Sequence, residues 1–133
     1  MKEERLKNNQ LVSNIGLFYV CYELSKRGWN CLPTTRNARG VDLVIYSQDG
    51  KKKYTIQVKA LSKKPAVPFG SKPNLMAEFV IICRNLANKP EIFVLKSDEV
   101  KLVQNEKRNR KSNWFQRKNY EKFRDRWDKI KNN

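Results

Sequence analysis

The sequence predicts an α/β (α+β) fold in which a central mixed β-sheet of about five strands is flanked by helices. Three observations carry this prediction. Residues 11–24 read LVSNIGLFYVCYEL, an apolar stretch of helical length. Residues 53–60 alternate polar and apolar side chains with the period of two that a strand requires. Residues 78–84 contain a continuous apolar run of the kind that a central strand shows.

The first half of the chain predicts one helix followed by three strands. The helix is expected to be buried on most faces, because its apolar residues leave no wide polar face. It should end near Gly28, a residue type that is common just after a helix. Turn residues separate the three strands that follow, so we expect an antiparallel meander. These strands are predicted at residues 29–36, 41–46 and 53–60.

The second half predicts a loop, two strands and a helical end. Residues 61–75 contain three prolines and three lysines but no acid, which favours a basic irregular loop. Strands are expected at 78–84 and 91–96. Residues 105–133 carry eleven Lys or Arg and four Asp or Glu, and we expect a basic helical segment there. Four apolar residues at helical spacing are expected to dock it on the sheet rather than to stack on bases: Tyr120, Phe123, Trp127 and Ile130.

Length and charge limit the class of protein. A chain of 133 residues suits a single domain with an ordinary core, so residues 1–133 are predicted to form one domain. The net charge of +16 favours a polyanionic partner, which means nucleic acid or an anionic membrane. With 39% hydrophobic residues the chain still has enough apolar material to fold around a core.

Missing residue types exclude several chemistries. The chain has no histidine, which removes imidazole bases, the Ser-His-Asp and Cys-His triads and His-containing zinc sites. Its three cysteines form no CxxC pair, so we expect core thiols in a reducing compartment. No apolar run reaches the roughly 20 residues of a membrane span, and the N-terminus carries acids. A cytoplasmic protein is therefore expected.

Three polar residues are unusual in their placement on two neighbouring predicted strands. Asp42 begins an otherwise apolar strand, and Gln57 and Lys59 point to one face of the next. If the hairpin pairs these strands, the three side chains converge. Hydrolysis of a phosphodiester needs such a group, because oxygen ligands hold Mg²⁺ and a cation positions the attacking water and stabilises the developing charge.

These residues resemble a known group of enzymes. The sequences RGVDL at 39–43 and IQVKA at 56–60 resemble the core of the PD-(D/E)XK nuclease superfamily, which includes restriction endonucleases and Holliday-junction resolvases. The resemblance covers residues 10–60 and implies a restriction-endonuclease-like, nuclease-like domain. It implies that Asp42, Gln57 and the backbone carbonyl of Val58 hold Mg²⁺, for which Mn²⁺ is a possible substitute. Lys59 then serves the nucleophile, and Glu23 of the first helix joins the catalytic group.

The chain departs from the superfamily at Gln57, where most members carry Asp or Glu. An amide oxygen binds a hard cation less strongly than a carboxylate does, and Glu23 is expected to make up part of the lost charge. The superfamily also commonly has a helix after the motif strand, whereas residues 61–75 read as a loop. Phosphate contacts are expected from the neighbouring basic residues Arg36, Arg39, Lys63, Lys64 and Lys72.

Each site residue also has a structural interpretation. Asp42 follows a glycine and suits a turn. Gln57 and Lys59 suit the solvated face of a strand, and Glu23 suits a helix-surface acid paired with Arg27 four residues on. These interpretations stay open at the level of sequence.

The function that these features favour is a Mg²⁺-dependent DNA endonuclease, either restriction-type or junction-resolving, acting as a homodimer on duplex or branched DNA. An alternative is a non-catalytic nucleic-acid-binding module that keeps the nuclease fold, which Gln57 favours. A third, an RNA-binding protein, rests on charge alone.

Overall fold

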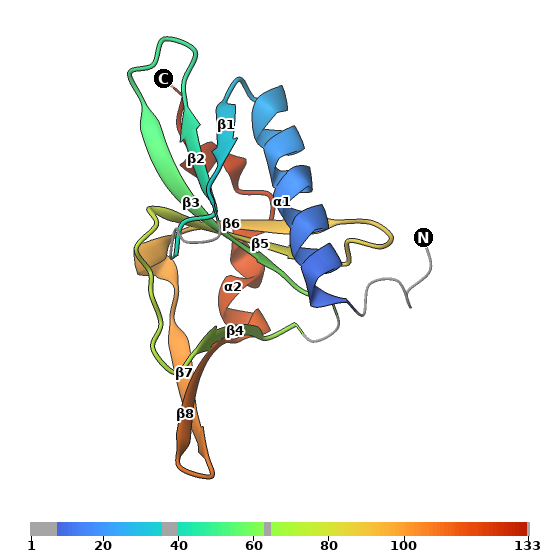
Figure 1. Cartoon of the computed structure of the whole chain (residues 1–133), viewed down its shortest axis with the longest axis vertical. Helices are drawn as coiled ribbons and strands as arrows, with labels where there is room; N and C mark the ends of the chain where they lie inside the picture. The colour runs from blue at the N-terminus through green and yellow to red at the C-terminus, as the bar shows by residue number, and fades with distance from the viewer. Residues whose placement is uncertain (1–7, 36–39, 63–64, 133) are drawn as a thin grey trace.

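The structure is a computed structural model that describes residues 8–35, 40–62 and 65–132 (Figure 1). Its larger sheet, sheet A, has five strands in the order β1-β2-β3-β5-β6, in which only β3 and β5 are parallel neighbours. The strands are β1 (Asn30–Pro33), β2 (Leu43–Tyr46), β3 (Lys53–Ala60), β5 (Phe79–Arg84) and β6 (Glu91–Lys96). The predicted α+β fold around a mixed five-stranded sheet is therefore confirmed.

The first three strands of sheet A form the predicted antiparallel meander. β3 has the predicted bounds, whereas β2 begins at Leu43, so that Asp42 lies one residue before the strand. The register pairs Leu43 with Ile56. Asp42 therefore enters the sheet beside the middle of β3, where Gln57 follows Ile56.

Helix α1 (Asn9–Lys26) lies along one face of sheet A (Figure 1). The side chain of Asn8 caps its first turn, where Oδ1 accepts a hydrogen bond from the Gln10 amide at 2.9 Å. The residues that α1 buries recur every fourth position: Val12, Gly16, Val20 and Leu24. On the rest of the helix, Phe18 and Tyr22 are 63% and 59% exposed. The prediction of a helix buried on most faces is wrong, because a single stripe contacts the sheet.

The closest approach of α1 to the sheet is at Gly16. A Cβ atom added to Gly16 would lie 2.7 Å from the Cβ of Ala60, closer than two carbon atoms can pack. Glycine at this position therefore allows the helix backbone to come down onto the last residue of β3. Because Ala60 directly follows Lys59, the Gly16 contact also fixes the end of β3 that carries the candidate site.

The opposite face of sheet A packs against the base of a smaller antiparallel sheet, sheet B, which has the order β4-β8-β7. Its strands are β4 (Val67–Gly70), β7 (Leu102–Lys107) and β8 (Arg110–Phe115). Phe69 and Phe115 pack there with Val80 and Ile82 of β5. Two predictions are wrong here: residues 61–75 are not all loop, since they contain β4, and residues 105–133 are not one helical segment, since they begin with a β-hairpin.

Short helical turns complete the chain. They are η2 (Ser97–Glu99), α2 (Arg117–Tyr120), η3 (Glu121–Phe123) and η4 (Trp127–Lys129). Tyr120 and Phe123 enter the core on the sheet B side, whereas Trp127 and Ile130 enter the core on the α1 side. All four residues are core as predicted, but they serve opposite faces of sheet A. The chain turns between the two pairs at Asp125, whose φ is 54° and whose amide donates to the Ile92 carbonyl at 2.8 Å.

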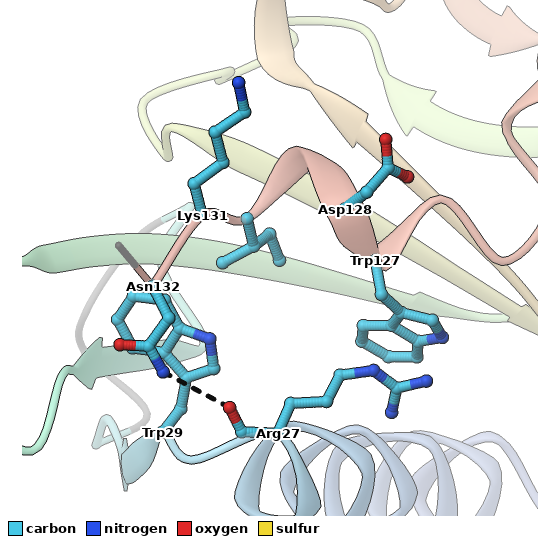
Figure 2. A pocket seen from close by; sticks show the side chains of 7 residues that line it. Arg27, Trp29, Trp127, Asp128, Lys131 and Asn132 are labelled. Atoms are coloured by element: carbon cyan, nitrogen blue, oxygen red, sulfur yellow. Dashed lines mark hydrogen bonds between the residues drawn. The ribbon is translucent and has the colours of Figure 1, made fainter.

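The last residues close over the end of α1, as Figure 2 shows. The guanidinium of Arg27 lies 4.4 Å from the ring centroid of Trp127, and Nδ2 of Asn132 donates to the Arg27 carbonyl at 3.2 Å. The hollow among these side chains has a volume of about 390 Å³. Its acid, Asp128, is bonded to Arg126 at 2.9 Å. We interpret this region as the packing of the chain end, because Arg27 and Asp128 already have charged partners.

Candidate active site

Asp42 is held in place by backbone bonds to both neighbouring strands. Its amide donates to the Ile56 carbonyl at 2.9 Å, and its own carbonyl accepts from the Thr34 amide at 3.0 Å. The Thr34 hydroxyl donates to the carbonyl of Val41, the residue before Asp42, at 2.6 Å. The aspartate therefore continues the pairing of β1, β2 and β3 by one residue and has a fixed backbone.

The Asp42 carboxylate bridges from the start of β2 to β3. Its Oδ2 atom accepts a hydrogen bond from the backbone amide of Val58 at 2.8 Å. In an antiparallel ladder the N–H and C=O groups of one residue point to the same neighbour, so the Val58 carbonyl is directed to the same edge. A carboxylate and a peptide carbonyl thus lie together where β2 begins. The bond spans sixteen residues, so Asp42 does more than form a local turn.

Gln57 supplies an oxygen atom without a partner. Its neighbours Ile56 and Val58 pack on the α1 side of sheet A, so the side chain between them points to the opposite face. The Oε1 atom is buried, and within the described residues it accepts no hydrogen bond. Leaving a buried acceptor unpaired costs about 1–3 kcal/mol. The interpretation of Gln57 as part of a solvated strand face is therefore wrong.

Lys59 lies on the same face as Gln57, two residues further along β3, and is covered by β4. Its ammonium donates to the Pro68 carbonyl at 3.2 Å and lies 4.6 Å from the ring centroid of Phe69. Burial lowers the pKa of Lys59, and the charge of Asp42 opposes that shift. Lys59 is therefore a half-buried ammonium in the electrostatic field of Asp42.

Glu23 does not lie with Asp42, Gln57 and Lys59. It lies on α1, against the other face of sheet A from Gln57 and Lys59. Its carboxylate pairs with Lys26 at 3.3 Å and with Arg27 at 3.2 Å. Burial raises the pKa of Glu23, but the bonds from Arg27 and Lys26 outweigh burial and leave it lowered. The interpretation of Glu23 as a paired helix-surface acid is the one that the structure supports.

The predicted phosphate contacts are only partly described. Lys72 is exposed on the segment between β4 and β5 and, in the described part of the chain, makes no hydrogen bond or ion pair with Asp42, Gln57 or Lys59. The other predicted contacts lie outside the described residues: Arg36, Arg39, Lys63 and Lys64.

Two contacts next to the site are not predicted from the sequence. Gly40 has φ of +71°, and a Cβ atom there would lie 3.2 Å from Cγ of Asn74, so the segment after β4 packs against the turn that leads into Asp42. Pro68 and Phe69 cover Lys59 from a region that reads as loop. The sequence signal for both is weak, because prolines before and within this region hide the short strand β4.

The donors present fit a hard cation. Asp42 keeps lone pairs beyond the one that Val58 uses, Gln57 has an unused oxygen, and the Val58 carbonyl points to the same edge. Over the described ranges, no three His, Cys, Asp or Glu side chains gather into a metal-binding group. An ion here would be held by two side chains and a carbonyl, with water and substrate oxygens filling the shell, as Mg²⁺ sites permit.

Comparison of the chain with family models, with curated proteins and with solved structures finds no match. In the ranges that the structure describes, no helix combines the length and apolar character that crossing a membrane requires. The functional argument therefore rests on the site itself.

Proposed function

We propose that this chain is a Mg²⁺-dependent DNA endonuclease that hydrolyses phosphodiester bonds. The observation that carries the proposal is the Gln57 oxygen, which is buried, has no hydrogen-bond partner among the described residues and follows Ile56, the residue whose carbonyl accepts from the Asp42 amide. A protein retains such an oxygen at a cost in stability, and a bound cation would satisfy it. The resemblance of residues 39–43 and 56–60 to PD-(D/E)XK nucleases supports the same proposal.

In this proposal Asp42, Gln57 and the Val58 carbonyl hold the metal. The bound ion supplies positive charge to the phosphate oxygens and to the attacking water. Lys59 contributes a second positive charge on the same face and orients the phosphate or the nucleophile. Its lowered pKa brings the ammonium closer to exchanging a proton at working pH. Glu23 has no role in this site, because it is paired on α1.

A second candidate function is a non-catalytic module that binds nucleic acid. Two observations favour it: an amide stands where a metal-binding carboxylate is usual, and the described residues gather no three-carboxylate cluster. The net charge of +16 fits either function. Cleavage separates the two.

The test uses the purified full chain with supercoiled plasmid, linear duplex and a four-way junction, each with Mg²⁺, Mn²⁺ or EDTA. We expect cleavage with either metal and none with EDTA. Asp42→Asn and Lys59→Ala should each reduce the rate by at least about 100-fold. The preferred substrate distinguishes a restriction-type enzyme from a junction resolvase.

Matched controls come from the same chain. Lys53→Ala changes an exposed lysine of the same strand, Asp98→Asn changes an exposed aspartate of η2, and Glu23→Gln changes the paired acid of α1. All three should cleave within about twofold of the original protein. Cleavage that survives EDTA or Asp42→Asn would reject the nuclease proposal, and binding to all three substrates without cleavage would favour the non-catalytic module.

The homodimer remains a prediction. Two protomers would supply one site for each strand of a two-fold symmetric target. Sedimentation of the full chain with and without duplex DNA tests it, and a monomer in both conditions contradicts it.

A further inference from the structure

The β7–β8 hairpin projects from the body of the fold as a two-stranded ribbon, which we call the β7–β8 ribbon (residues 102–115) (Figure 1). Every residue from Val103 to Lys111 is exposed. The two strands pair without interruption from Leu102↔Phe115 at the base to Lys107↔Arg110 at the tip. The base is anchored in the core through the buried Phe115. The ribbon is therefore a continuously paired arm with a buried base and a solvent-exposed end.

One face of the ribbon is basic and polar. Side chains alternate between faces along a strand, so the cross-strand pairs Lys107↔Arg110, Asn105↔Ser112 and Val103↔Trp114 share one face. A hollow of about 850 Å³ lies on this face. Its lining residues are Asn105, Lys107, Arg108, Arg110, Ser112 and Trp114. The face thus carries cations at its tip and amide and hydroxyl groups behind them.

The positively charged residues at the ribbon tip occupy positions that are unfavourable for the stability of the hairpin. Lys107 and Arg110 are directly opposite each other, and like charges in that position destabilise a hairpin. Arg108 has φ of 51°, in a turn position that favours Asn or Gly. Of the ion pairs found in the described residues, none involves Lys107, Arg108 or Arg110. Within the part of the chain that the structure describes, no acid neutralises these charges.

The ribbon is joined to the candidate active site through β4. Trp114 of the ribbon pairs with Pro68, and the Pro68 carbonyl accepts the hydrogen bond from Lys59. A ligand that follows the ribbon from its tip to its base would therefore arrive at β4, the strand that covers Lys59. This continuity suits a long polyanion that contacts the tip and the site together.

We propose that the Lys107–Arg110 face of the ribbon enters the major groove of duplex DNA and holds the duplex against the Asp42 site. The proposal rests on the proposed function for its choice of DNA as the polyanion. A two-stranded ribbon fits the major groove of B-DNA, which is about 12 Å wide, whereas the major groove of A-form RNA is too narrow to admit side chains. Lys107 and Arg110 contact phosphates, and Asn105 and Ser112 face base edges.

The ribbon does not suit single strands. Proteins that bind single-stranded nucleic acid without sequence preference stack successive bases on several aromatic side chains. The basic face has one aromatic residue, Trp114, which is half-buried at the base and donates from Nε1 to the Ser112 hydroxyl at 3.0 Å. Duplex is therefore the form that the ribbon fits.

The test measures the affinity of the full chain for a labelled duplex of mixed sequence in EDTA, across a salt series. The variant Lys107→Gln/Arg110→Gln removes two charges from the ribbon face. The matched control, Lys51→Gln/Lys53→Gln, removes two charges from the exposed β2–β3 turn and the start of β3. We expect the ribbon variant to bind duplex at least about fivefold more weakly and to lose about 1.8 from the slope of log K against log salt. The control should change affinity by less than about twofold.

A single change at the turn separates binding from folding. Arg108→Gly suits the backbone of the turn better than arginine does, so the midpoint of thermal unfolding should stay the same or rise while duplex affinity falls. Parallel measurements use single-stranded DNA and duplex RNA of the same sequence. Equal loss of affinity in ribbon variant and control overturns the proposal, as does a ribbon variant that loses more affinity for single-stranded DNA or duplex RNA than for duplex DNA.

The outcomes separate this inference from the proposed function. If duplex binding depends on the ribbon but no cleavage occurs, the ribbon proposal stands and the proposed nuclease function is rejected. If cleavage depends on Asp42 but the ribbon variant binds duplex DNA as tightly as the original protein, the proposed nuclease function stands and the ribbon proposal is rejected.

Discussion

The Asp42 carboxylate accepts a hydrogen bond from the backbone amide of Val58, with 2.8 Å between Oδ2 and N. This bond joins the start of β2 to the middle of β3 and holds the Asp42 carboxylate at Val58, the residue that follows Gln57. The negative charge itself is not needed for this hydrogen bond, since the neutral amide oxygen of an asparagine at the same position also accepts a hydrogen bond. Structure and chemistry at Asp42 are therefore separable by mutation.

The first prediction separates them. Asp42→Asn keeps an oxygen acceptor for Val58, so the free energy of unfolding should fall by no more than about 1 kcal/mol. Asp42→Ala leaves the Val58 amide unpaired and should cost about 1–3 kcal/mol. Urea denaturation of both variants measures these changes. Equal losses in the two variants would show that the hydrogen bond contributes nothing.

The second prediction concerns the unpaired oxygen of Gln57. Gln57→Met keeps the length of the side chain and removes the buried acceptor, so stability in EDTA should rise by about 1 kcal/mol while cleavage is lost. Gln57→Glu should be less stable than the original protein in EDTA and should recover with Mg²⁺, because a buried carboxylate beside Asp42 needs a cation. Thermal unfolding in EDTA and in Mg²⁺ checks both variants. A Gln57→Met protein that is less stable in EDTA contradicts the account.

The third prediction concerns pH. Burial lowers the pKa of Lys59 below that of an exposed lysine, against the opposing charge of Asp42. The unfolded chain therefore holds more protons between the folded pKa and 10.5, and stability should rise with pH across that window. Lys59→Met lacks this contribution, so it should be the more stable protein at pH 7 and lose that advantage as the pH approaches 10.5.

Urea denaturation of the original protein and of Lys59→Met across pH measures this difference. Lys53→Met, which removes an exposed lysine of the same strand, is the matched control for the loss of one charge. An advantage of Lys59→Met that grows with pH has the wrong sign and rejects the interpretation.

The fourth prediction tests the contact that fixes the end of β3. Gly16→Ala should favour the isolated helix but destabilise the protein by about 1–3 kcal/mol, because the added methyl group overlaps Ala60. Ala60→Gly in the same chain should recover most of the loss, since it vacates the space that the methyl group needs. Chemical denaturation of the two single variants and the double variant measures the coupling. If the stability losses of the two single variants simply add in the double variant, the strain in Gly16→Ala does not come from the contact with Ala60.

Much of sheet A was predictable because its strands carry strong local signals. The clean alternation of residues 53–60 and the polar turn before them define β3 and its pairing with β2. This pairing is also why the neighbourhood of Asp42, Gln57 and Lys59 could be predicted. The unpaired state of the Gln57 oxygen could not, because it depends on how β4 and the segment after it cover that face.

Sheet B was not predictable for a physical reason. Residues 103–111 are exposed on both faces of the β7–β8 ribbon, so no alternation of apolar and polar residues marks the strands. β4 contains Pro68, which is tolerated because β4 lies at the edge of its sheet. The helical spacing of Tyr120, Phe123, Trp127 and Ile130 does not reflect one helix. The first two residues end α2 and η3, the last two lie in and just after η4, and the two pairs enter the core on opposite faces of sheet A.

The central claim is that Asp42 and Gln57 together hold a divalent cation. Its most direct test is a Mn²⁺ titration of the full chain in which electron paramagnetic resonance counts the free ion. The account predicts one Mn²⁺ per chain, with affinity reduced at least about tenfold by Asp42→Asn and by Gln57→Met and unchanged by Asp98→Asn. Equal Mn²⁺ affinity in all four proteins, or no binding by the original chain, would contradict it.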